Sequence, residues 1–215
     1  MNYDSAFDAL SEKLKALLLN SGAGHDYDHT LRVLKNAELL LAEEPGADRE
    51  VLRFAALLHD CARPEEHASK GQVCHAQRGA VIAAQLLAEA NMDEPFCAAV
   101  AAAVRSHRYR DGIVPHTPEG KILYDADKLD SLGAVGLGRA FLFAGACGAR
   151  VHNTPEEALG NEAYGPEDTA YREYLVKLRH LPGAMLTPAG RRMGAERLRF
   201  METFFEQLNE EVYGN

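Results

Sequence analysis

The stretch FAALLHDCA, residues 54–62, carries the strongest structural signal in the chain. An apolar run from Phe54 to Leu58 leads directly into the titratable pair His59 and Asp60. Asp48 has the side chain of an N-cap, because its carboxylate can accept hydrogen bonds from the first free N–H groups of a helix. The sequence therefore predicts a helix over about 48–58 that ends on a histidine and an aspartate.

Helical periodicity continues on both sides of this stretch. Apolar residues recur at three- and four-residue steps from Phe7 to Leu18 and again from Asp28 to Leu41. Further helices are predicted over 76–90 and 93–107, from 118 to about 129, and over 198–212. We expect a polar loop from Pro64 to Gly71, a second loop over 108–117 and a less regular region over 153–169. No segment alternates with the period of two that marks a half-buried strand, so the predicted fold class is all-α.

The composition is that of a globular protein with an acidic balance. Of the 215 residues, 47% are apolar and 26% are charged, which is enough apolar content to bury a core. Lys and Arg number 23 against 32 Asp and Glu, a formal charge of −9. This charge argues against binding to a nucleic-acid polymer or an anionic membrane. A small anionic substrate is still compatible, because a metal ion can reverse the field inside one pocket.

The sequence predicts a cytoplasmic protein. Residues 1–19 lack the basic start, apolar run and cleavage site of a signal peptide, and no apolar stretch reaches the roughly 20 residues that span a bilayer. The four cysteines show no CxxC spacing, so free thiols in a reducing compartment are expected.

Histidines and aspartates gather at the ends of the predicted helices. His29 follows the start of one helix, His59 and Asp60 end the next, and His107 ends a later one. His75 lies at the start of the helix predicted over 76–90, and Asp127 lies in the helix predicted from 118 to about 129. Such groups are costly to bury unless they are paired or bound to a metal, and imidazole with carboxylate is a typical donor set for first-row divalent ions. A metal site assembled from facing helices is therefore expected.

In order and context, these residues resemble the H…HD…D signature of the HD-domain metal-dependent phosphohydrolases. The stretches HDYDHTLRVLKNA (25–37), FAALLHDCA (54–62), AAVRSH (102–107) and KILYDADKLDSLGAVGLGRAF (121–141) resemble a bacterial subfamily of predicted HD phosphohydrolases. So does KLRHLPGAMLTPAGRRMGAERLRFMETFFEQL (177–208). The resemblance implies one all-α domain, residues 1–215. It would contain an HD-type helical bundle at about 22–135 and a helical C-terminal extension at about 136–215.

The resemblance also implies ligands and a reaction. The metal ligands would be His29, His59, Asp60 and Asp127, holding a divalent Mn, Fe, Co, Ni, Zn or Mg. Such a site would hydrolyse a phosphate ester or anhydride in a nucleotide or another small phosphorylated compound by metal-activated water. Asp60 would also act in catalysis.

The resemblance also implies roles for side chains near these ligands. His107 would protonate a leaving oxygen, and the substrate would be bound by His75, Arg63 and Lys128. The monomer and the homodimer are both left open.

Three alternatives stay open. Some HD proteins bind two metals through H…HD…H…H…D, and His75 and His107 occupy the two middle places. A related di-iron arrangement performs oxygenation, and a third possibility is a non-catalytic nucleotide-binding or signalling module. His75 and His107 can equally be helix-end residues that satisfy carbonyl groups. Four more histidines are interpreted as surface residues, namely His67, His116, His152 and His180.

Overall fold

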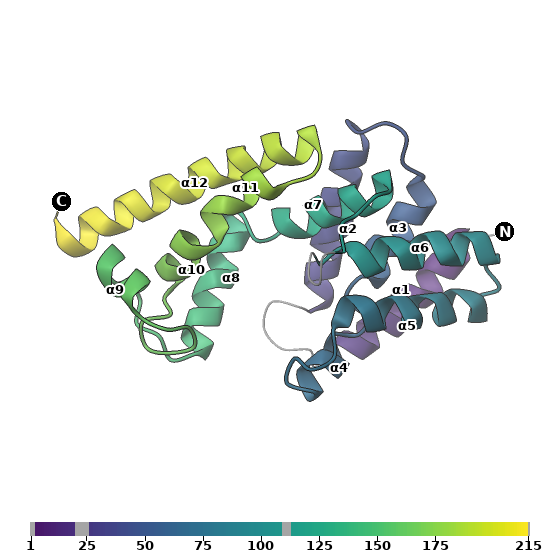
Figure 1. Ribbon diagram of the computed structural model, residues 1–215, viewed down its shortest axis with the longest axis horizontal. Coiled ribbons are helices and arrows are strands. Elements are labelled where there is room, and N and C mark those ends of the chain that lie inside the picture. Colours follow the sequence, from purple (N-terminus) through teal and green to yellow (C-terminus); the bar gives the residue numbers. More distant parts are fainter. Residues whose placement is uncertain (1–2, 20–25, 109–112, 215) are drawn as a thin grey trace. The chain divides into compact units, whose positions relative to one another are not determined.

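A computed structural model describes residues 3–19, 26–108 and 113–214 of the protein. Every regular element in these ranges is a helix, which confirms the predicted all-α class (Figure 1). The first seven are α1 (Tyr3–Leu18), α2 (Tyr27–Leu41), α3 (Arg49–Leu58), α4 (Arg63–Ala68), α5 (His75–Glu89), α6 (Glu94–Ser106) and α7 (Pro118–Leu129). The others are α8 (Gly133–Ala146), α9 (Pro155–Gly160), α10 (Ala170–Val176), the 3-10 helix η1 (Leu178–His180), α11 (Leu181–Ala184) and α12 (Pro188–Tyr213).

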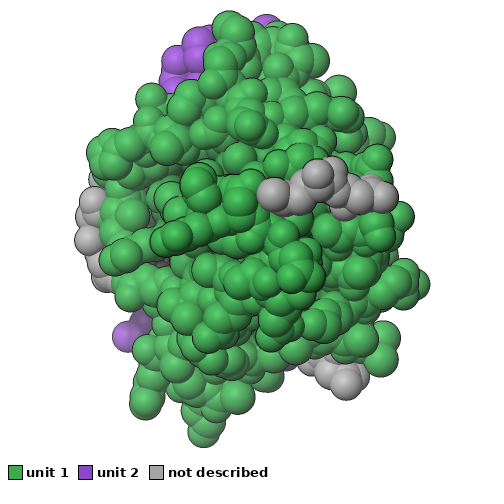
Figure 2. Space-filling model, turned by 90° about the vertical axis from the view of Figure 1, so that its right-hand side faces the viewer, with its two compact units in different colours: residues 1–127 green, residues 128–215 purple. Residues whose placement is uncertain are grey.

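The chain forms two compact units, residues 1–127 and 128–215, which Figure 2 colours separately. Helix α7 continues from the first unit into the second. The predicted division into a bundle at about 22–135 and an extension at about 136–215 stays a prediction.

Helix α3 is central to the first unit. It packs against α1, α2 and α6, and its buried side chains lie all around its axis. Phe54 is completely buried, and its ring lies 5.4 Å from that of Phe7 and 5.3 Å from that of Phe96, measured between centroids. Only Arg49, Glu50 and Arg53 of this helix are not buried, and a helix that is buried on most of its sides belongs in a core. This burial holds the end of α3, which carries His59 and Asp60, inside the unit.

The expected boundaries of α1, α2, α3, α5, α6 and α7 are close to those observed, whereas α12 begins ten residues before the predicted helix over 198–212. Asp48 is the N-cap of α3, and its carboxylate accepts a hydrogen bond from Val51 N at 3.0 Å. The predicted loop after Pro64 is wrong, since residues 63–68 form α4. Pro64 lies in the first turn of that helix, where a missing N–H removes no intrahelical hydrogen bond.

The second unit is organised around the 26-residue helix α12. It packs against α8 and α11, and Phe205 on α12 contacts Tyr171 of α10 with ring centroids 5.1 Å apart. His152 is buried beside Tyr171 and contacts Asn209 Oδ1 through Nε2 at 2.8 Å. The expectation that His152 lies on the surface is therefore wrong, whereas His67, His116 and His180 are exposed as predicted.

Two further expectations can be compared with the described residues. All four cysteines are free thiols, as predicted, and Cys61 and Cys97 are buried. Within the described ranges no single helix is long and apolar enough to cross a membrane; only α7 and α8 taken together reach the required length and composition.

Candidate metal centre

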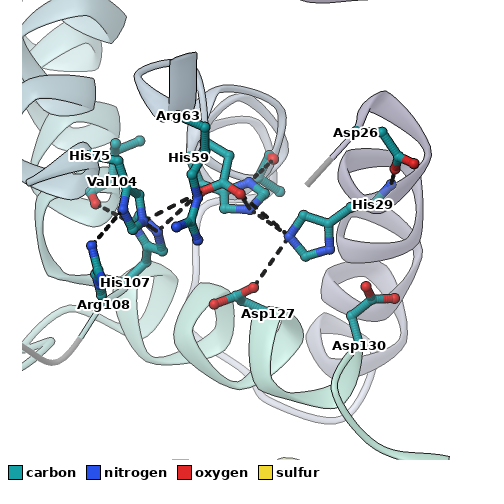
Figure 3. A network of polar contacts seen from close by, with 12 residues as sticks. Asp26, His29, His59, Arg63, His75, Val104, His107, Arg108, Asp127 and Asp130 are labelled. Carbon is teal, nitrogen blue, oxygen red and sulfur yellow. Dashed lines mark hydrogen bonds and ion pairs between the residues drawn. The ribbon is translucent and has the colours of Figure 1, made fainter. Parts of the chain in front are cut away.

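Helix ends bring the histidines and aspartates of the first unit together (Figure 3). His29 lies in the first turn of α2, where the N-cap Asp26 accepts a hydrogen bond from His29 N at 2.9 Å. His59 is the C-cap of α3, and Asp60 follows it. His75 begins α5, and His107 is the C-cap of α6. The prediction that these groups sit at helix ends is thus confirmed by their positions in the fold.

Helix packing explains why ends that are distant in sequence meet. Helices α5 and α6 pack against one another over a short connection, so the start of α5 lies near the end of α6. Asn36 on α2 donates a buried hydrogen bond from Nδ2 to the carbonyl oxygen of Ala126 on α7 at 3.0 Å. This bond ties the helix of His29 to the helix of Asp127.

One group of three donors consists of His29, His59 and Asp127, which we call the first triad. The Nε2 atoms of His29 and His59 are 3.3 Å apart, and His29 Nε2 is 3.4 Å from Asp127 Oδ1. The donor atoms of the triad all lie within 4.8 Å of one another. Both imidazoles are completely buried.

A second group consists of Asp60, His75 and His107, which we call the second triad. The Nε2 atoms of His75 and His107 are 3.1 Å apart. Asp60 Oδ1 is 3.4 Å from His75 Nε2 and 3.8 Å from His107 Nε2. The donor atoms of this triad also lie within 4.8 Å of one another.

Asp60 connects the two triads through its two carboxylate oxygens. Oδ1 faces the second triad, while Oδ2 is 3.6 Å from the Nε2 atoms of both His29 and His59. Arg63 donates from Nε to Oδ1 at 2.9 Å. Asp60 is 1% exposed, so its charge is satisfied inside the protein and not by bulk water.

Backbone carbonyls set the tautomer of two histidines. His59 Nδ1 lies 2.8 Å from Ala56 O, and His107 Nδ1 lies 2.6 Å from Val104 O. A carbonyl only accepts, so each Nδ1 carries the proton and donates it, and each neutral ring turns an unprotonated Nε2 toward the cluster. Lone pairs that face one another across 3 to 4 Å fit a cation between them, which is the arrangement expected of metal-ligating histidines.

Burial keeps the imidazoles in the neutral form that binds metals. Desolvation lowers the pKa of His59 to about 4 and the pKa of His75 to about 3, both from an ordinary value of 6.5. At neutral pH these rings therefore carry a free lone pair, and a divalent ion does not have to displace a proton.

The three residues predicted to bind the substrate lie in different surroundings. His75 lies in the second triad, and Arg63 contacts the carboxylates of Asp60 and Glu66. Lys128 is half-buried in the last turn of α7 and belongs to the second unit. Their roles toward a substrate, and that of His107 as an acid, stay predictions.

Sequence reasoning missed Glu66. Its Oε2 is 2.9 Å from His75 Nδ1 and accepts from Arg63 Nη1 at 2.8 Å, while its Oε1 accepts from Arg108. The spacing of three residues between Arg63 and Glu66 is the available signal, because it predicts an ion pair once residues 63–68 are recognised as a helix.

Comparison with known proteins gives the family of the part of the chain that carries these residues. The family described as the HD domain matches residues 26–132. The protein YpgQ of Bacillus subtilis strain 168 is 31% identical over 202 residues, which cover 94% of this chain and 91% of YpgQ.

Solved structures extend the likeness to three dimensions. The structure of YpgQ in complex with ADP has a TM-score of 0.72 at 28% identity and covers 97% of this chain and 98% of its own. An HD-superfamily hydrolase from Bacillus thuringiensis has a TM-score of 0.75 at 29% identity, with complete coverage of both chains.

Proposed function

The chain belongs to the HD-domain family, whose members bind divalent metals, and from that premise we propose that it is a metal-dependent phosphohydrolase. Its substrate would be a nucleotide or another small phosphorylated compound, cleaved at a phosphate ester or anhydride. The single observation that carries the proposal is the pair of His/Asp triads whose histidines are buried, with the two carboxylate oxygens of Asp60 facing one triad each. The ADP held by the YpgQ structure supports a nucleotide as the substrate class.

The proposed ligands follow from the donor atoms. His29, His59, Asp60 and Asp127 would hold one ion, and Asp60, His75 and His107 would hold a second. The two oxygens of Asp60 face different triads, which favours a bridging role. A divalent ion bound by these donors would lower the pKa of a coordinated water and offset the negative charge of a phosphoryl group.

Two side chains of the site have roles beyond metal binding: Asp60 as a proton acceptor and Arg63 as the group that orients it. The carboxylate of Asp60 faces both triads, so it is the group we propose to take up the proton of the attacking water. Arg63 holds one of its oxygens by hydrogen bonding and thereby restricts the carboxylate to one orientation. Because Nδ1 of His107 donates to Val104, its Nε2 has no proton in the neutral ring, which favours a ligand role over the acid role suggested by the sequence.

Hydrolysis by the purified protein tests the proposal. Nucleoside mono-, di- and triphosphates and a generic phosphate monoester are incubated with Mn²⁺, Co²⁺ or Mg²⁺, and the released phosphate and nucleotide are measured. Activity should disappear with a chelator and in Asp60→Ala, and circular dichroism should show that this variant is folded. Glu65→Ala is the matched control, since Glu65 is an exposed carboxylate of α4 that pairs with Arg78.

Other outcomes identify the alternatives. Activity that survives both chelation and Asp60→Ala would refute the mechanism. Nucleotide binding without turnover would indicate a signalling module. The two triads together also suit a pair of iron ions, so oxygen consumption by protein that contains two irons per chain would indicate an oxygenase.

A further inference from the structure

His75 has two contacts on the side of its ring that faces away from the other donors of the second triad. Its Nδ1 lies 2.9 Å from Glu66 Oε2 and 2.8 Å from Arg108 Nη1. The ring is completely buried, so bulk water does not compete for this nitrogen. The hydrogen bond made at Nδ1 therefore decides which nitrogen of the neutral ring carries the proton.

The two partners of Nδ1 select opposite tautomers. A carboxylate only accepts, so a hydrogen bond to Glu66 places the proton on Nδ1 and leaves a lone pair on Nε2. A guanidinium only donates, so a hydrogen bond from Arg108 requires a lone pair on Nδ1 and moves the proton to Nε2. In that second tautomer, Nε2–H would point at the lone pair of His107 Nε2, 3.1 Å away, and His75 could not ligate an ion through this atom.

We infer that Glu66 is the positioning residue that makes His75 a metal ligand, by accepting a hydrogen bond from its Nδ1–H, and that Arg108 favours the competing, non-ligating tautomer. The inference rests on the proposed function, since it requires an ion at the second triad. A carboxylate that accepts from a ligating imidazole raises the basicity of the donor nitrogen and holds the plane of the ring.

The surroundings of Glu66 support this role. Its side chain is only 12% exposed, and both of its oxygens accept charged hydrogen bonds, Oε2 from Arg63 and Oε1 from Arg108. Arg63 in turn donates to Asp60 Oδ1. Arg63 thus donates to the carboxylates of both Asp60 and Glu66. Asp60 is itself a member of the second triad, and Glu66 contacts the triad through His75. The orientation of Glu66 is therefore coupled to that of Asp60.

Mn²⁺ binding to the metal-free full-length protein tests the inference, with affinities measured by calorimetry and stoichiometry by elemental analysis. The wild type should bind two ions. Glu66→Ala should weaken the second ion by about 10- to 100-fold and leave the first within about twofold. Glu66→Gln keeps an oxygen that can accept from Nδ1, so its loss should be smaller. Glu65→Ala, which removes the neighbouring exposed carboxylate, should bind both ions like the wild type.

A spectroscopic readout separates positioning from general support of the fold. In the Zn²⁺-loaded wild type, long-range ¹H–¹⁵N NMR should show His75 protonated at Nδ1, with the signal assigned by its loss in His75→Gln. A His75 protonated at Nε2 in the loaded protein would overturn the inference. So would an unchanged second affinity in Glu66→Ala, or equal losses in Glu66→Ala and Glu66→Gln.

Failure of the proposed function would look different. A wild type that binds no Mn²⁺, Co²⁺ or Zn²⁺ overturns the metal centre and this inference together. A wild type that binds a single ion overturns the second site and this inference, while metal-dependent hydrolysis at the first triad stands.

Discussion

The metal-free protein should lose stability when the pH is lowered from 7 to 5, and His59 should be a principal cause. Burial lowers the pKa of His59 to about 4, whereas the unfolded chain titrates it near 6.5. Between these two values the unfolded state binds a proton at His59 that the folded state does not. The free energy of unfolding therefore falls as the pH falls through this window.

The size of the effect follows from the two pKa values. Each pH unit inside the window changes the free energy of unfolding by about 1.4 kcal/mol for one proton. From 6.5 down to pH 5 is about 1.5 units, so His59 contributes a loss of about 2 kcal/mol. The pKa of His75 is also lowered by burial, to about 3, and this acts in the same direction.

Urea unfolding of chelator-treated protein at pH 7 and pH 5 measures this loss. His59→Gln should reduce the difference between the two pH values by about 2 kcal/mol, whatever its effect on stability at either pH alone. His67→Gln, at an exposed histidine of α4, should leave the difference unchanged. The reasoning would be refuted by a His59→Gln protein whose pH dependence equals that of the wild type.

Four further outcomes are expected. Phe54→Ala should lower the free energy of unfolding, measured in urea, by about 3–5 kcal/mol, because it opens a cavity at a completely buried ring. Phe200→Ala, at a residue that is 53% exposed, should change it by less than about 1 kcal/mol. Asp26→Ala should cost about 1 kcal/mol by the same measurement, because it removes the N-cap hydrogen bond to His29 N. Cys61 should resist iodoacetamide at pH 8 until urea is added, because burial raises the pKa of its thiol to about 12. Mass spectrometry follows the labelling, and labelling of Cys61 in the native protein would contradict this. Mn²⁺ at 100 times the Kd of one site should raise the free energy of unfolding at pH 7 by about 2.7 kcal/mol through that site, and no rise would argue against a metal centre formed only in the folded chain.

Local sequence information was sufficient for most helices of residues 1–129 and for the helix ends that carry the titratable side chains. Apolar spacing and caps predicted the all-α class and the boundaries of six helices between residues 3 and 129, because both signals act within one or two helical turns. Asp48 illustrates this, since its capping bond spans three residues. The same reasoning failed at Pro64, where a residue that ends one helix also suits the first turn of another.

The sequence by itself placed six titratable side chains at helix ends and in α7, and it identified their likeness to the HD family. Only the tertiary structure decided how they divide into two triads, how the oxygens of Asp60 are shared between them, and how Glu66 and Arg108 compete for His75. The physical reason is distance along the chain. His29 and Asp127 meet because α2 and α7 are tied together by a buried hydrogen bond between residues 90 positions apart, and no local periodicity encodes such a contact.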